Sequence, residues 1–246
     1  MHDKDVRVGH VPRDVRHHFH EALRDLERRA LGGLDLDIRQ LDRALEALTY
    51  QDVELAGMVV ADDDQVDGRY LEVHQGVLSL LATQSPVATD LRLVAALLHI
   101  MRCIERIGDQ CVNMAKLVPL SGYEQPKDKD ILDSIERMGR HAHSQLSQAK
   151  EAFASRDVAL AHDLVRQDVE INRLNRGIFR RAVEIGDDVE MREWAMLMVL
   201  VARALERIGD NTVDIAEQVV FVVTGLFREL ADASSATPEG TQAASG

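Results

Sequence analysis

Acidic residues recur at a four-residue spacing in two distant parts of the chain. Glu105 and Asp109 are four residues apart. Glu206, Asp210 and Asp214 repeat this spacing and extend it by one position. In a helix such residues share one face, with Cβ atoms about 5–6 Å apart, and like charges there are mildly destabilising. Neighbouring arginines or a bound cation would offset the repulsion, because carboxylate oxygens suit hard cations and bridged metal clusters.

A second set of polar residues has the spacing needed to face the first. Asp63 and Asp67 are four residues apart, and Asp168 and Asn172 follow 105 positions later in the same arrangement. If the helices that contain these residues are antiparallel neighbours, the facing rows converge on one site in each half of the chain. The candidate metal ligands are Asp63, Asp67, Glu105, Asp109, Asn113, Asp168, Asn172, Glu206, Asp210 and Asp214.

These rows belong to an internal repeat. The segment from Glu105 to Asp109 recurs 101 positions later, from Glu206 to Asp210. Residues 97–116 and 198–217 are identical at about two positions in five. The offset falls from 105 to 101 along the repeat, as a shorter loop in the second half would produce. A duplicated three-helix unit is therefore predicted.

The hydrophobic pattern predicts the elements that position these residues. Apolar residues return every three or four positions, which is typical of helices. We expect an all-α fold, a tandem duplication of a three-helix up-down bundle with six helices and a pseudo-twofold relation between the halves. The expected helices span residues 13–50, 53–83, 87–119, 128–155, 158–185 and 189–230, with N-caps at Asp52, Ser85 and Asp157. The expected domains are a flexible tail at 1–12, a bundle at 13–120, a linker at 121–127, a bundle at 128–230 and a disordered tail at 231–246.

Two glycines stand on the apolar side of the helices that hold the acidic rows. Gly108 and Gly209 occupy equivalent positions in the repeat. Glycine inside a helix costs about 1 kcal/mol relative to alanine. This cost is explained if another helix approaches closely, so both glycines are predicted to have a packing role.

Composition narrows the possible partners and location. The 246 residues have a net charge of −13, which disfavours binding to nucleic acid or to anionic lipid heads. The apolar runs are much shorter than the about 20 residues of a membrane-spanning helix, so no direct membrane insertion is expected. The N-terminus has no apolar signal core. We expect a cytoplasmic protein.

The cysteines and histidines suggest no site of their own. Cys103 and Cys111 lie eight residues apart, about 12 Å along one helix, which exceeds the roughly 7 Å that a disulfide spans. Both are interpreted as small core residues. His74 and His99 are interpreted as packing or surface residues. The remaining cluster, interpreted as a solvated helix start, is His17, His18 and His20.

Three interpretations of the acidic rows remain open at this point. They could bind metal in a non-catalytic protein, serve a metal-dependent phosphohydrolase, or form an ion-paired helix surface on a bare scaffold. The chain contains no phosphate-binding loop, zinc-protease motif or nucleophile elbow. It also lacks the Glu-x-x-His motif of di-iron bundles. An enzyme is therefore not favoured.

Several segments together resemble the PhoU family, the accessory regulators of the phosphate-specific ABC transport system. They are Ala88–Arg92, Glu105–Asp109, Arg203–Asp210 and Val223–Gly225. The resemblance covers roughly residues 13–228. It implies two three-helix bundles, a homodimer, and metal clusters of iron or zinc held by the acidic rows. Asn113 and Asn172 depart from a pure carboxylate set, so the two halves are expected to differ in metal occupancy.

The resemblance also implies a biological role. PhoU-like proteins restrain phosphate uptake and phosphate-starvation signalling when phosphate is plentiful. They do so as non-catalytic adaptors that contact the ATPase subunit of the phosphate ABC transporter and a membrane sensor histidine kinase. An accessory protein of a different phosphate carrier remains the nearest alternative.

Overall fold

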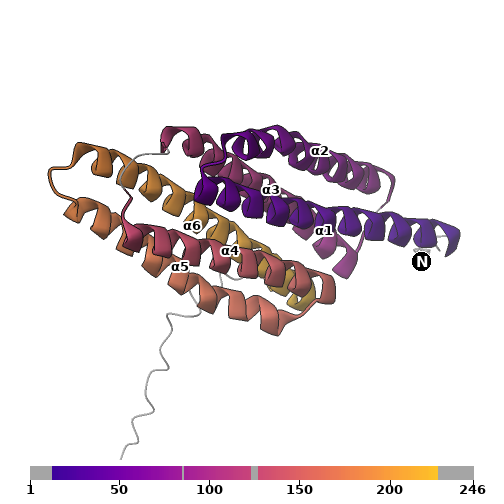
Figure 1. Cartoon of the computed structure of the whole chain (residues 1–246). Helices are drawn as coiled ribbons and strands as arrows, with labels where there is room; N and C mark the ends of the chain where they lie inside the picture. Colours follow the sequence, from indigo (N-terminus) through magenta and orange to yellow (C-terminus); the bar gives the residue numbers. More distant parts are fainter. Residues whose placement is uncertain (1–12, 85, 123–126, 227–246) are drawn as a thin grey trace, which may run out of the picture.

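The computed structural model describes residues 13–84, 86–122 and 127–226, and this part of the chain is built from six long helices (Figure 1). They confirm the six helices expected from the sequence, and all helix ends except the last lie within two residues of the expected positions. The helices are α1 (Arg13–Tyr50), α2 (Val53–Thr83), α3 (Thr89–Leu117), α4 (Lys129–Ser155), α5 (Val158–Glu184) and α6 (Val189–Thr224). A short 3-10 turn, η1 (Val118–Leu120), follows α3.

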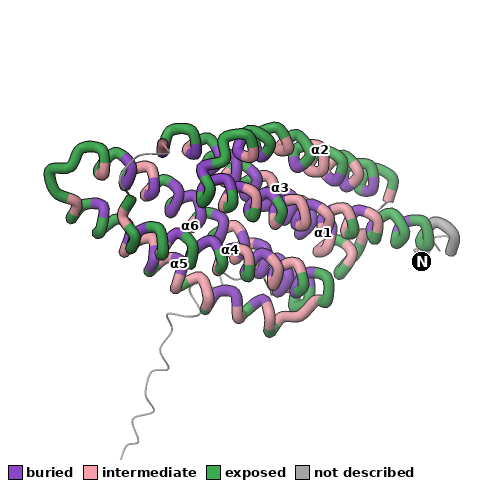
Figure 2. Tube along the Cα trace, in the orientation of Figure 1, coloured by how far each residue is buried: buried purple, intermediate pink, exposed green. Residues whose placement is uncertain are grey.

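The helices form two up-down units of three. Helices α1, α2 and α3 pack against one another, and α4, α5 and α6 do the same. The two units meet where α3 packs along α6 and α1 packs beside α4 (Figure 1). Buried segments line the faces where helices meet, whereas α2 is exposed along its outer side (Figure 2). The predicted duplication of a three-helix bundle is confirmed.

The repeat extends to the backbone of the tight turns. Gln51 and Arg156 occupy equivalent positions and both adopt the left-handed conformation, with φ of 55° and 58°. Each is followed by an aspartate that caps the next helix. The side chain of Asp52 accepts a hydrogen bond from the backbone N–H of Leu55, and the side chain of Asp157 accepts from the backbone N–H groups of Ala159 and Leu160. The two predicted N-caps in these turns are therefore confirmed.

Three helix ends differ from the sequence prediction by two residues or more, and one of them is the end of α3, which lies at Leu117 instead of residue 119. Helix α3 begins at Thr89 rather than at residue 87, after Ala88 with a φ of 47°. Helix α6 ends at Thr224 rather than at residue 230, because Gly225 adopts a φ of 75° and its N–H bonds the carbonyl of Phe221. Ser85 and the predicted tails at 1–12 and 231–246 lie outside the described residues.

A continuous apolar core passes through both units. Its largest fully buried side chains include Trp194, Phe153 and Leu34. Ion pairs at the edge of the core join the units directly: Arg156 bonds Glu27 at 2.6 Å and Lys150 bonds Asp35 at 2.5 Å. No helix in the described part of the chain combines the length and the apolar character that crossing a membrane requires.

Candidate metal centre

In the first unit, Asp63 lies between α2 and α3 beside Gly108. A Cβ atom built on Gly108 would lie 3.1 Å from Asp63 Oδ1, so the glycine leaves room for the carboxylate. Gln40 of α1 donates from Nε2 to the same oxygen at 3.2 Å. The predicted close approach at Gly108 is confirmed, and a carboxylate from the acidic row makes it. We name Asp63, Asp67, Glu105 and Asp109 the N-terminal acidic cluster.

The second unit repeats this arrangement more tightly. A Cβ atom built on Gly209 would lie only 2.6 Å from Asp168 Oδ1 and 3.5 Å from Gln145 Oε1. Asn172 donates from Nδ2 to Asp168 Oδ2 at 2.6 Å. In the described part of the chain, the buried Asp168 Oδ1 has no hydrogen-bond partner. The C-terminal acidic cluster comprises Asp168, Asn172, Glu206 and Asp210.

Burial and like charges act together on the N-terminal acidic cluster. Burial raises the pKa of Asp63, and the nearby charges of Asp67 and Asp109 raise it further. Burial likewise raises the pKa of Glu105, with contributions from Asp109 and Asp67. Each carboxylate therefore senses one member of the facing row, so α2 and α3 place the two rows within electrostatic range of each other.

The same effects act on the C-terminal acidic cluster, most strongly at Asp168. Burial raises the pKa of Asp168 to about 6, and the charge of Asp210 adds to the effect. Burial also raises the pKa of Asp210, against the opposing influence of Arg203 and Arg207. A cation placed among these oxygens would relieve the repulsion and favour the ionised forms.

The remaining three of the ten predicted ligands are Glu206, Asn113 and Asp214. Glu206 forms an ion pair with Arg203 on its own helix. Asn113 is exposed. Burial raises the pKa of the half-buried Asp214, and His99 and Arg106 of α3 lie close enough to oppose part of this rise. Asp214 is thus turned toward the opposite unit as well as toward its own row.

The donor sets of the acidic clusters fit a hard cation. They offer carboxylate oxygens from two facing helices, and Asp168 Oδ1 is a buried oxygen that has no hydrogen bond among the described residues. The ligand oxygens are not drawn into tight groups of three. Among the described residues, two groups of three His, Cys, Asp or Glu side chains have their ligand atoms within 4.8 Å of one another. One group is His17, His18 and Glu21, and the other is His99, Cys103 and Asp214. Metal binding by the ten predicted ligands stays a prediction.

Sequence reasoning missed three polar residues beneath the acidic clusters. Gln40 and Gln145 are buried on α1 and α4 beside the aspartates, and they obey the same 105-residue offset. Extending the repeat into the first helix of each unit would have found them. Asp37 is fully buried, and neither carboxylate oxygen has a hydrogen bond in the described part of the chain. Burial raises its pKa well above the usual range, and nearby Asp63 adds to this.

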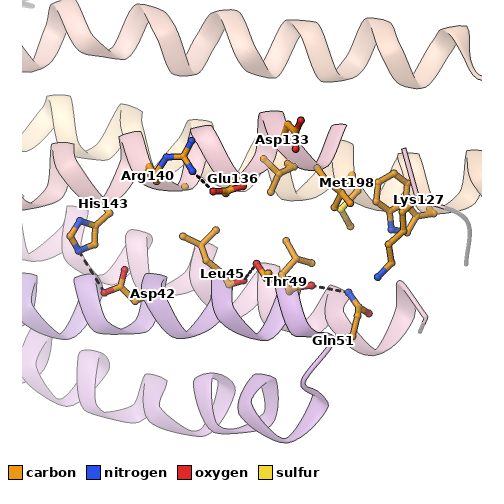
Figure 3. A pocket seen from close by; sticks show the side chains of 15 residues that line it. Asp42, Leu45, Thr49, Gln51, Lys127, Asp133, Glu136, Arg140, His143 and Met198 are labelled. Atoms are coloured by element: carbon orange, nitrogen blue, oxygen red, sulfur yellow. Dashed lines mark hydrogen bonds and ion pairs between the residues drawn. The ribbon is translucent and has the colours of Figure 1, made fainter. Parts of the chain in front are cut away.

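A large cavity lies elsewhere, between α1, α4 and the start of α6 (Figure 3). It has a volume of about 720 Å³ and an apolar wall that includes Trp194 and Met198. Asp42 and His143 face each other across its rim, 3.6 Å apart. None of the ten predicted metal ligands lines it. The acidic clusters are therefore separate from this cavity.

Comparison with known proteins agrees with this architecture. A PhoU domain matches residues 34–118 and again 135–219. The phosphate-specific transport system accessory protein PhoU homolog of Clostridium acetobutylicum is 29% identical over 216 residues, covering 87% of this chain and 98% of that protein. The homolog from Deinococcus radiodurans is 33% identical over 200 residues, covering 80% and 92%. The crystal structure of PhoU from Pseudomonas aeruginosa has a TM-score of 0.79 and 28% identity, covering 85% of this chain and 100% of that one. The chain belongs to the PhoU family, with two PhoU domains in tandem.

Proposed function

We propose that this protein is a non-catalytic regulator of phosphate uptake and of phosphate-starvation signalling. The observation that supports this most directly is the match of both three-helix units to the PhoU domain, together with relatives named as accessory proteins of the phosphate-specific transport system. In this role the protein acts in the cytoplasm as an adaptor. Its partners are the ATPase subunit of a phosphate ABC transporter and a membrane sensor histidine kinase. Like the family in general, it is proposed to work as a homodimer.

The acidic clusters are proposed to hold the metal. Asp63, Asp67, Glu105 and Asp109 serve the first unit, and the equivalent row around Asp168 serves the second. A bound iron or zinc ion would supply positive charge that links the second and third helices of each unit. The glycines at 108 and 209 support this role, because they let the aspartates sit between those helices.

An adaptor has more support than a metal-dependent phosphohydrolase. The acidic clusters lie along helix faces, and Asp67 and Asp109 are exposed there. The 720 Å³ cavity, which could enclose a substrate, is lined by none of the proposed ligands. If the protein were a phosphohydrolase, purified protein would hydrolyse phosphate esters with added metal, and Asp109→Ala would abolish the turnover.

A deletion strain tests the proposed role. We expect its phosphate uptake and phosphatase expression to remain high in phosphate-rich medium, and the wild-type gene to restore repression. A gene with Asp63→Ala and Asp168→Ala should fail to restore it while the protein accumulates normally. Normal repression in the deletion strain would contradict the regulatory role. An accessory protein of another phosphate carrier would instead change uptake without changing phosphatase expression.

A further inference from the structure

Three metal-binding side chains meet at the contact between the two units. His99 and Cys103 lie one helical turn apart on α3, and Asp214 reaches them from α6. All three are positions where the two copies of the repeat differ. Their counterparts are Leu200, Ala204 and Asn113. The duplication that accounts for the acidic clusters therefore does not account for this set.

The three side chains are graded in exposure from the core to the surface. Cys103 is 1% exposed and lies at the base, Asp214 is half-buried, and His99 is exposed at the rim. One ligand atom from each lies within 4.8 Å of the other two. In the described part of the chain, no hydrogen bond engages any of the three side chains. Their donor atoms are therefore available to a ligand that enters from the side of His99.

The donor types select the kind of ligand. A thiol, an imidazole and a carboxylate form the mixed sulfur, nitrogen and oxygen set that suits zinc, whereas a purely carboxylate set suits harder ions. A tetrahedral zinc ion holds its ligand atoms about 3.3–3.8 Å apart. The present separations are all within 4.8 Å, so they exceed this spacing by no more than about 1.5 Å. We propose that His99 and Cys103, together with Asp214, which is reassigned from the ten predicted ligands of the acidic rows, form a binding site for a zinc-like divalent cation that is distinct from the two acidic clusters.

The charges around the site are compatible with a cation. Burial raises the pKa of the Cys103 thiol to about 12, and the nearby charges of Asp214, Asp37 and Glu217 raise it further, against Arg106. The thiol is therefore protonated at neutral pH. Coordination replaces its proton, which leaves to solvent, and the cation then partners the thiolate. Three protein ligands leave the fourth position of a tetrahedral ion to water.

An ion at this site would join the units. Its ligands come from the third helix of the first unit and the third helix of the second, which pack directly against each other. The acidic clusters, by contrast, join helices within one unit. Occupancy of the new site is therefore expected to stabilise the contact between units.

Cobalt(II) titration of the full-length, chelator-treated protein tests the site, because a cobalt–thiolate bond gives a charge-transfer absorption in the near ultraviolet. We expect this band to saturate at one cobalt per chain in the wild type and to disappear on addition of excess zinc. Replacing each ligand by its counterpart in the other copy gives conservative variants. Cys103→Ala should abolish the band, and His99→Leu and Asp214→Asn should each weaken cobalt binding at least tenfold.

Two controls separate this site from other cysteines and from the acidic clusters. Cys111→Ala removes the other buried thiol and should leave the band unchanged. Asp63→Asn combined with Asp168→Asn alters both acidic clusters and should also leave it unchanged. Far-ultraviolet circular dichroism verifies that each variant is folded. A wild-type protein without the band, or a folded Cys103→Ala protein that retains it, would overturn the proposal.

Discussion

The N-terminal and C-terminal acidic clusters share one plan but differ in how tightly it is built. Asp63 Oδ1 receives a hydrogen bond from Gln40, and it would lie 3.1 Å from a Cβ atom on Gly108. Asp168 Oδ1 has no such bond in the described structure, and the corresponding separation at Gly209 is only 2.6 Å. The free energy needed to ionise the buried carboxyl group therefore differs between the equivalent residues Asp63 and Asp168. Duplication preserved the geometry of the site, whereas the balance between burial and hydrogen bonding diverged.

The first unit contains a buried carboxyl group, Asp37, on α1, outside the helices that hold its acidic cluster. Asp37 is fully buried on α1, and the equivalent position of α4 is Ala142. Burial therefore opposes ionisation most strongly at Asp37 in the first unit and at Asp168 in the second, which lie on different helices of the repeat. We infer that the C-terminal acidic cluster responds more strongly to protons and cations than its counterpart.

The largest expected effect is at the tighter glycine. Gly209→Ala places a methyl group against Asp168 Oδ1 and should lower the free energy of unfolding by about 2 kcal/mol, because the short aspartate cannot move far. Gly108→Ala should cost less than about 1 kcal/mol, since alanine's helix propensity offsets a milder contact. Urea denaturation of both variants measures the difference. Equal losses would contradict the inferred difference in tightness.

Removing the buried carboxyl of the first unit should stabilise the protein. Asp37→Ala copies the residue of the second unit and removes a buried group that lacks a hydrogen bond. We expect the free energy of unfolding to rise by about 1–2 kcal/mol at pH 7. Thermal and urea unfolding measure this change. A loss of stability would show that Asp37 has a compensating partner or bound ion.

The raised pKa of Asp168 predicts a pH dependence of stability in metal-free protein. Its pKa is about 6 when folded, against about 4 in an unfolded chain, so the folded state binds more protons between these values. Stability from this group is therefore complete below about pH 4 and falls as the pH rises through 6. Because Asp168 is partly exposed, we expect a change of only about 1 kcal/mol.

Asparagine variants check the assignment of this pH dependence. Asp168→Asn should flatten the fall in unfolding free energy between pH 4 and 7 in protein treated with a chelator. Asp63→Asn should flatten it less, since burial raises the pKa of Asp63 less than that of Asp168, although hydrogen bonds to amide side chains lower the pKa of both. An Asp168→Asn protein with the wild-type profile would exclude Asp168 as the source.

The smallest expected effect comes from exchanging the residues that distinguish the rows. Asn172→Asp gives the C-terminal acidic cluster the residue found at Asp67. It removes the donor to Asp168 and adds a charge, so metal-free protein should lose about 0.5–1 kcal/mol of stability. The same change should strengthen metal binding, as isothermal titration with iron(II) or zinc would show. Weaker binding would contradict the idea that the clusters bind cations through their carboxylates.

Much of this fold follows from local signals in the sequence. The apolar periodicity and the caps at Asp52 and Asp157 place the helices to within a few residues, because those signals act within one helix. The internal repeat identifies the acidic rows on the second and third helices of each unit, because the same residues recur at the same spacing. Asp37 was also detectable in principle, since it lies three residues after Leu34 and four before Leu41, both fully buried. An aspartate at such a position of the helix is unusual.

The meeting of His99, Cys103 and Asp214 could not be predicted in the same way. It depends on the register of α3 against α6, which is set by packing between the units. The sequence interpretation of His99 as a lone packing or surface residue is consistent with its exposure, but it misses the two neighbours. Local periodicity fixes which face of each helix is apolar, but it does not fix how far two long helices slide along each other.

Metal content measured by elemental analysis tests the central claim that the acidic clusters bind metal. The protein should be untagged, purified without chelator, and contain Cys103→Ala so that the acidic clusters are the remaining predicted sites. We predict stoichiometric iron or zinc in this protein and its loss when Asp109→Ala and Asp210→Ala are added. Absence of metal from the first protein, or retention of metal by the second, would contradict the claim.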